Sequence, residues 1–62
     1  MKNKLREFRA GKRMTQDELA AKANVSRQTI NAIENDKYDP SLPLAFSLAK
    51  VFRCSIEELF CE

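Results

Sequence analysis

Apolar residues recur between positions 16 and 35 at the intervals of one, three and four that mark one face of a helix. They form two sets, one on each side of Asn24: Leu19, Ala20 and Ala23, then Val25, Ile30 and Ile33. Asn24 suits the left-handed backbone of a tight turn, which glycine adopts most easily and Asn next. We therefore predict two short helices that cross closely at Ala20, where the side chain is small.

Polar residues ahead of each apolar set match the signals with which helices begin. Thr15 followed by Glu18 has the spacing of a capping box, in which each side chain bonds the backbone N–H of the other residue. Ser26 is a favourable N-cap for the second helix. These signals predict helix starts directly after positions 15 and 26.

The same spacing predicts a further helix before the paired helices and a loop after them. Leu5 and Phe8 share one face of a helix from about Lys4 to Lys12, which Gly11 would end. The segment Lys37–Pro40 breaks the helical pattern, so we expect a loop there.

Two more helices are expected after this loop. Ser41 can cap a helix whose apolar face continues to about Phe52. Ser55 and Glu58 repeat the capping-box spacing, so a last short helix is expected over Ile56–Phe60. Strand patterns and internal repeats are not evident. The sequence therefore predicts an all-α fold, a compact five-helix bundle with a helix-turn-helix at residues 16–35.

Length and charge refine this picture. The 62 residues allow one domain, 1–62, with one small core that is marginally stable without a partner subunit. Residues 1–13 carry six basic side chains and one acidic one, a net charge of +5, whereas the remainder carries −3. A basic end can steer a protein toward phosphate, although charge runs are usually only solvated. Because no membrane-spanning apolar run or signal peptide is evident, we expect a cytoplasmic protein and no membrane partner.

The outward face of the second predicted helix is unusually rich in amide and hydroxyl groups. It comprises Ser26, Arg27, Gln28, Asn31 and Ala32, with Thr29 near the edge. Arg can bond guanine O6 and N7, Gln and Asn can bond adenine N6 and N7, and Ala suits the thymine methyl group. Two helices crossed at a turn can place the second in the major groove of DNA. A polar, solvated face without a partner is the competing interpretation.

Several segments together resemble the helix-turn-helix regulators of the phage repressor and Cro type. The resemblance covers about Lys4 to Phe60, and its marks are Thr15-Gln16-Asp17-Glu18-Leu19-Ala20, Val25-Ser26-Arg27-Gln28-Thr29-Ile30, Ile33-Glu34-Asn35 and Ser55-Ile56-Glu57-Glu58-Leu59-Phe60. The segment Lys37-Tyr38-Asp39-Pro40-Ser41-Leu42 is similar to the loop of the short, stand-alone members. Many members have Gly where this chain has Asn24, which is a conservative departure.

The resemblance implies roles for individual residues. It implies base reading by Ser26, Arg27, Gln28, Asn31 and Ala32. It implies contacts with DNA phosphate at Gln16, Asn35, Lys37 and Tyr38, to which we add Thr15 and Thr29 at the two helix starts. It also implies a salt bridge between Arg9 and Glu34 that links the first helix to the recognition helix.

Catalysis, metal binding and cofactors find little support in the composition. The chain has no His, and the seven-residue spacing of Cys54 and Cys61 matches no zinc pattern. No nucleophile or acid–base set is apparent, so we expect no enzyme, no cofactor and no small-molecule ligand. Cys54 is expected to be a buried thiol, and an intersubunit disulfide at Cys61 is disfavoured because cytosolic thiols stay reduced.

These observations predict a sequence-specific regulator that binds double-stranded DNA, with repression as the default action. One helix reads only a few base pairs, so we expect a symmetric homodimer on a pseudo-palindromic operator. The expected dimer interface comprises Ile56, Leu59, Phe60 and Cys61, with part of the preceding helix. The alternative is a protein-interaction module, such as an antitoxin-like or polymerase-docking domain.

Overall fold

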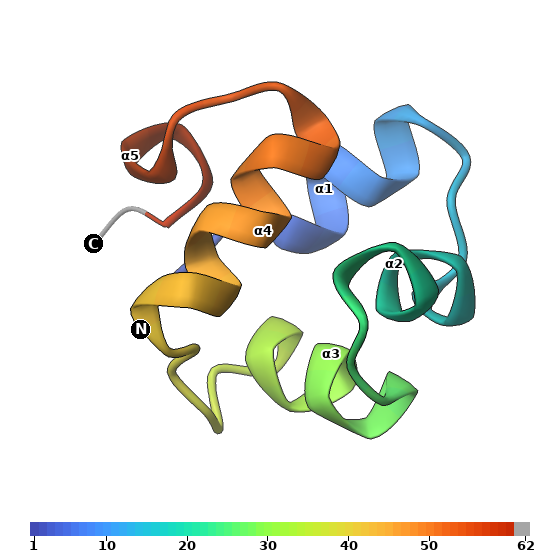
Figure 1. The fold of residues 1–62 in the computed structure, drawn as a ribbon, viewed down its shortest axis with the longest axis horizontal. Coiled ribbons are helices and arrows are strands. Elements are labelled where there is room, and N and C mark those ends of the chain that lie inside the picture. Colours follow the sequence, from blue (N-terminus) through green and yellow to red (C-terminus); the bar gives the residue numbers. More distant parts are fainter. Residues whose placement is uncertain (61–62) are drawn as a thin grey trace.

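The computed structural model describes residues 1–60, and over this range the chain forms five helices and no strand. The helices are α1 (Leu5–Gly11), α2 (Gln16–Ala23), α3 (Arg27–Glu34), α4 (Leu42–Phe52) and α5 (Ile56–Leu59). In Figure 1, α4 crosses the middle of the molecule, with α3 below it and α5 to one side. The expected all-α bundle with a helix-turn-helix is confirmed.

Capping side chains set the starts of the last four helices. Thr15 and Glu18 form the expected capping box at α2, and Ser55 and Glu58 form the second one at α5. At α3, the Ser26 hydroxyl accepts a hydrogen bond from the backbone N–H of Thr29. Ser41 caps α4 in the same way. Each cap satisfies an N–H group that the first turn of a helix leaves without a partner.

Left-handed residues set the ends of α2 and α4. Asn24 adopts φ 59° and ψ 44°, which confirms the turn expected between α2 and α3. Arg53 adopts φ 52° after α4. α1 ends at Gly11, as expected, and the left-handed residue in the turn that follows is Arg13, with φ 52°.

The core lies between the helices and draws on all five of them. Six side chains in it are fully enclosed: Leu5, Leu19, Ile30, Ile33, Leu48 and Leu59. α2 packs against both α3 and α4, while α1 packs against α3 and α5 against α4. The rings of Phe8 and Phe52 meet edge to face at 5.6 Å, which joins α1 to α4. Val25 is only half-buried at the edge of this core.

The prediction of a dimer interface on the last helix is wrong for two of its residues. Leu59 is fully buried in the core and Phe60 is 9% exposed, so neither presents apolar surface to another subunit. α5 folds back onto α4, and a backbone hydrogen bond from Lys4 to the carbonyl of Leu59 ties it to the start of α1. Ile56 is half-buried, and Cys61 lies outside the described residues.

Candidate nucleic-acid interface

α3 carries the side chains that the sequence proposed for base contacts. Ser26, Arg27, Gln28 and Asn31 are exposed, whereas Ala32 and Thr29 are half-buried. The hydroxyl groups of Ser26 and Thr29 lie 2.9 Å apart, so they bond each other at the start of the helix. The structure therefore places four of the five proposed base-reading residues on α3 and the fifth, Ser26, at its N-cap.

Glu34, at the end of α3, is the centre of the polar contacts that hold this helix. Its side chain is completely enclosed. Arg9 of α1 reaches it with two donors, Nε at 2.8 Å from Oε2 and Nη2 at 3.2 Å from Oε1. Gln16 of α2 donates to Oε1 at 3.0 Å, and Arg6 lies 3.5 Å from the same oxygen. Glu34 thus joins three helices at one carboxylate.

The contacts of Glu34 decide its charge. Burial by itself would raise the pKa of this carboxyl group, but the hydrogen bonds from Arg9 and Gln16 and the charges of Arg9 and Arg6 outweigh burial and lower the pKa below its usual value. The same ion pair raises the pKa of Arg9. Both groups are therefore charged near neutral pH. Arg9 also donates to the backbone carbonyl of Met14 at 2.8 Å, so it fastens the chain between α1 and α2 as well.

A row of side-chain amides continues from Glu34 across the outer side of α3. The Gln16 amide nitrogen also donates to the Asn31 side-chain oxygen at 3.2 Å. The Asn35 amide nitrogen donates to that oxygen at 3.1 Å and to the backbone carbonyl of Asn31 at 2.9 Å. Arg6 in turn donates to the Asn35 side-chain oxygen at 3.1 Å. We call the amides of Gln16, Asn31 and Asn35, together with the Arg6 guanidinium group that bonds Asn35, the amide row.

Arg27 is held less firmly than these residues. Its Nε lies 3.5 Å from a carboxylate oxygen of Asp17, the second residue of α2, and the two side chains are 57% and 78% exposed. An exposed pair at this distance contributes about 0–1 kcal/mol. The guanidinium group of Arg27 is therefore near an acid but free to exchange that contact for another partner.

The segment after α3 presents two of the residues proposed for phosphate contacts. Lys37 and Tyr38 are exposed, and the backbone N–H of Lys37 bonds the carbonyl of Ala32 at 2.9 Å. Asp36 and Asp39 flank them and contact the N-terminal ammonium group of Met1. The hydrogen bonds that this ammonium group donates, first to Asp36 and then to Asp39, raise its pKa to about 10. Its charge offsets acidic groups that would otherwise oppose a phosphate.

Sequence reasoning missed two residues that tie α1 to the end of α3. Arg6 contacts both Glu34 and Asn35, as described above. Asn3 donates to the backbone carbonyl of Ile33 at 2.9 Å and accepts from the N–H of Leu5 at 3.0 Å. The position of Arg6, three residues before Arg9 on the same helix face, was a usable signal. Asn3 offered no comparable pattern.

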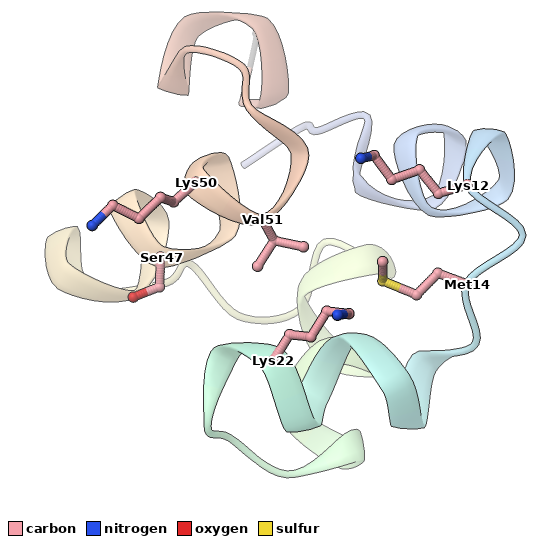
Figure 2. A pocket seen from close by; sticks show the side chains of 6 residues that line it. All are labelled: Lys12, Met14, Lys22, Ser47, Lys50 and Val51. Carbon is pink, nitrogen blue, oxygen red and sulfur yellow. The ribbon is translucent and has the colours of Figure 1, made fainter.

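A surface hollow of about 450 Å³ lies on another part of the molecule, between α2 and α4. It is lined by Lys12, Met14, Lys22, Ser47, Lys50 and Val51. In Figure 2, Met14 and Val51 point toward the same space, whereas the Lys50 ammonium group points away from it. No residue proposed for DNA contact lines this hollow, so we place the candidate site on α2 and α3.

The described residues show no grouping of three or more His, Cys, Asp or Glu side chains suited to a metal ion. Cys54 is half-buried, so the expectation of a buried thiol is met only in part. Burial and the nearby charge of Glu58 raise the pKa of the Cys54 thiol, so it is less reactive than an ordinary cysteine. Within residues 1–60, no helix has the length and apolar character needed to cross a membrane.

The crossed helices α2 and α3, with the polar outer face of α3, define a helix-turn-helix protein. The sequence model of the helix-turn-helix family matches residues 5–59. The chain belongs to this family, in its Cro/cI-type branch of DNA-binding transcriptional regulators.

Relatives and solved structures agree with this assignment. An uncharacterized HTH-type transcriptional regulator of Methanocaldococcus jannaschii, MJ0272, is 60% identical over 60 residues, which cover 97% of this chain and 91% of that protein. The restriction-modification controller protein C.AhdI from Aeromonas hydrophila has a similar structure, with a TM-score of 0.85 and 30% identity over 92% of this chain and 86% of that one. The HTH-type transcriptional activator BcrR of Enterococcus faecalis is 38% identical over 56 residues, which cover 90% of this chain and 28% of BcrR.

Proposed function

We propose that this regulator represses transcription by binding a pseudo-palindromic operator as a homodimer, with α3 in the major groove. The observation that carries the proposal is the enclosed Glu34 carboxylate, which fixes α3 against α1 and α2 through Arg9 and Gln16. A helix that is fixed to two neighbouring helices through one enclosed carboxylate presents its outer side chains at a constant angle. Constant geometry is what hydrogen-bond readout of base edges requires.

Base reading in this proposal falls to the outer side of α3. Arg27 is long, exposed and held only by Asp17, so it can exchange that contact for the bidentate edge of a guanine. Gln28 and Asn31 present amides beside it, and Ser26 and Ala32 complete the surface.

Phosphate contacts in this proposal flank α3 on both sides. Lys37 and Tyr38 would hold the backbone on one side, with Thr15 and Thr29 near helix starts. Asn35 has no phosphate contact in this proposal, because its side-chain nitrogen already donates to two oxygens of Asn31. Both N–H bonds of the Gln16 side chain are used within the protein, so we assign its phosphate contact to the backbone N–H at the start of α2. Phosphate contacts of this kind set the register of a protein on DNA without choosing the sequence.

In the proposed dimer, we place the contact with the second copy on α4 and the start of α5, and not on the apolar residues at the end of α5. Leu42 and Phe46 lie one helical turn apart on α4 and are 64% and 59% exposed, which is high for large apolar side chains. Beside them, a groove lined by Phe46, Ala49, Lys50, Cys54, Ser55, Ile56 and Glu57 separates α4 from α5. In a twofold pair, Phe46 of each copy can enter the groove of the other.

Charge also favours a twofold pair at this surface. Lys50 and Glu57 line the same groove, so a rotated second copy would bring a lysine of one subunit toward a glutamate of the other. Among the partners that could cover this surface, a second copy of the chain is the one that also supplies a recognition helix for the second half-site. Two recognition helices would then reach successive major grooves about 34 Å apart.

The test is selection of bound duplexes from a random pool, followed by anisotropy titration of the enriched sequence. We expect two inverted half-sites about one helical turn apart and affinity at least ~10³-fold tighter than for random duplex at physiological salt. Equal affinity for selected and random duplex would refute sequence-specific binding and favour the protein-interaction module. A single half-site would refute the dimer alone.

The sign of regulation needs its own measurement. Repression is proposed because a bound dimer blocks polymerase without further contacts, and we place this action on DNA in the cytoplasm. BcrR, named as an activator, shows that similar sequence occurs in proteins of the opposite sign. Transcription in vitro from a promoter that overlaps the selected operator should fall as the protein is added. A rise would assign activation.

A further inference from the structure

The Asn31 side chain has one amide end engaged by the protein and one end free. Its oxygen accepts hydrogen bonds from Gln16 at 3.2 Å and from Asn35 at 3.1 Å. An amide oxygen has two lone pairs, so these two bonds use its accepting capacity. Over residues 1–60, the Asn31 side-chain nitrogen makes no hydrogen bond to the protein, and the residue is exposed.

The orientation of Gln16 follows from Glu34. An ionised carboxylate only accepts hydrogen bonds, and Glu34 is held ionised by the two donors of Arg9. The Gln16 group that faces Glu34 at 3.0 Å must therefore be the NH₂ group. The second N–H of that group then points to Asn31.

The orientation of Asn35 follows from two other partners of fixed polarity. Its nitrogen faces the backbone carbonyl of Asn31 at 2.9 Å, and a carbonyl only accepts. Its oxygen faces the guanidinium group of Arg6 at 3.1 Å, and a guanidinium only donates. Turning the Asn35 amide over would oppose two donors at one end and two acceptors at the other.

The amide row therefore offers Asn31 two donors and leaves it one stable orientation, with its oxygen inward. We propose that Asn31 is a specificity-determining residue that donates only, and that it selects a base edge with an acceptor, such as guanine O6 or N7, adenine N7 or thymine O4. It rejects the N4 amino group of cytosine, which also donates. This inference rests on the proposed function, because it assumes that α3 lies in the major groove.

The inference changes what the residue type alone suggests. A free Asn reads adenine by donating to N7 and accepting from N6 at the same time. Here the accepting end is occupied by Gln16 and Asn35, so the second bond is not available. The N6 amino group of an adenine should therefore add nothing to its affinity for Asn31.

Two variants of Asn31 test this by selection from a random duplex pool. Asn31→Asp keeps an inward oxygen for Gln16 and Asn35 but replaces the outward donor with an acceptor. We expect the wild type to enrich an acceptor edge at one position and Asn31→Asp to favour cytosine or adenine there. Asn31→Ala should lose preference at that position alone. Since Asn31 is exposed, thermal unfolding should show all three proteins folded.

Base analogues in the selected operator separate donation from acceptance. The acceptor is removed by a 7-deaza analogue at a purine, or by the analogue that lacks O4 at a thymine. Either change should weaken wild-type binding about tenfold and leave the affinity of Asn31→Ala unchanged. Removing N6 from an adenine at this position should change nothing. Loss of wild-type affinity on removal of N6 would overturn the inference, as would an unchanged preference in Asn31→Ala. Wild type that enriches no sequence would instead refute the proposed function.

Discussion

Arg9 of α1 holds the fully enclosed carboxylate of Glu34 with two hydrogen bonds, of 2.8 and 3.2 Å, across 25 residues of sequence. Glu34 is the last residue of the recognition helix α3, and its side chain is enclosed rather than presented on the outer face. Glu34 also accepts from Gln16, which in turn orients Asn31 on the outer face. A contact in the interior thus determines what the outer surface can offer.

The first prediction concerns this pair. Arg9→Ala should lower the free energy of unfolding by about 3–5 kcal/mol, because it leaves a buried carboxylate without its main partner. Urea denaturation measures the change. Arg6→Ala is the matched control, since Arg6 is 59% exposed and 3.5 Å from the same carboxylate. It should cost about 0–1 kcal/mol. Equal losses in both variants would show that the burial of Glu34 does not determine the change in the free energy of unfolding.

The second prediction is a pH dependence. Glu34 has a lowered pKa in the folded protein, so folding favours its charged form. Its contribution to stability is present above its ordinary pKa of 4.5 and is lost as the pH falls through the lowered value. Denaturation at pH 7 and at successively lower pH should show this loss, and Glu34→Gln should lose less stability over the same range. A Glu34→Gln variant with an unchanged acid dependence would contradict the assignment.

The third prediction separates base contacts from phosphate contacts. Arg27→Ala should cost ~1–3 kcal/mol on the operator and relax preference at one position, whereas Lys37→Gln should weaken all duplexes alike and reduce the salt slope by about 1. Lys22→Gln is the control, because Lys22 lines the hollow between α2 and α4. It removes the same charge and should leave the salt slope nearly unchanged. Identical behaviour of Lys37→Gln and Lys22→Gln would contradict the proposed phosphate contact at Lys37.

The fourth prediction concerns Asp17, which lies 3.5 Å from Arg27. Asp17→Asn should tighten DNA binding by at most about fivefold, since it releases an exposed pair worth about 0–1 kcal/mol and removes a charge that repels phosphate. Anisotropy titrations at two salt concentrations measure this, and the gain should shrink at the higher one. Weaker binding with relaxed preference would mean that Asp17 orients Arg27 for reading.

The fifth prediction tests the revised dimer surface. Phe46→Glu should abolish self-association in sedimentation velocity while leaving the helical content unchanged, because Phe46 is 59% exposed. Phe46→Leu should retain association. Leu59→Ala should behave in the opposite way, with a loss of about 2–5 kcal/mol of stability, because Leu59 is fully buried within its own chain. Dimers of Phe46→Glu as stable as those of the wild type would exclude this surface.

Local patterns were sufficient to predict the helices and their starts. Thr15 with Glu18, and Ser55 with Glu58, form the capping boxes that their spacing indicated. Asn24 adopts the left-handed turn expected between the two apolar sets. These features depend on residues three or four positions apart, so the sequence contains the whole interaction. The resemblance to the Cro-type family rested on the same short segments.

By itself, then, the sequence determined the five helices, the helix-turn-helix and the polar outer side of α3. Only the tertiary structure decided that Leu59 lies inside the chain while Phe46 lies outside, because periodicity identifies an apolar face but not what covers it. Only the tertiary structure enclosed Glu34 and turned the oxygen of Asn31 inward. Both outcomes depend on partners from other helices, and the direction of a hydrogen bond is decided by what stands opposite it in space.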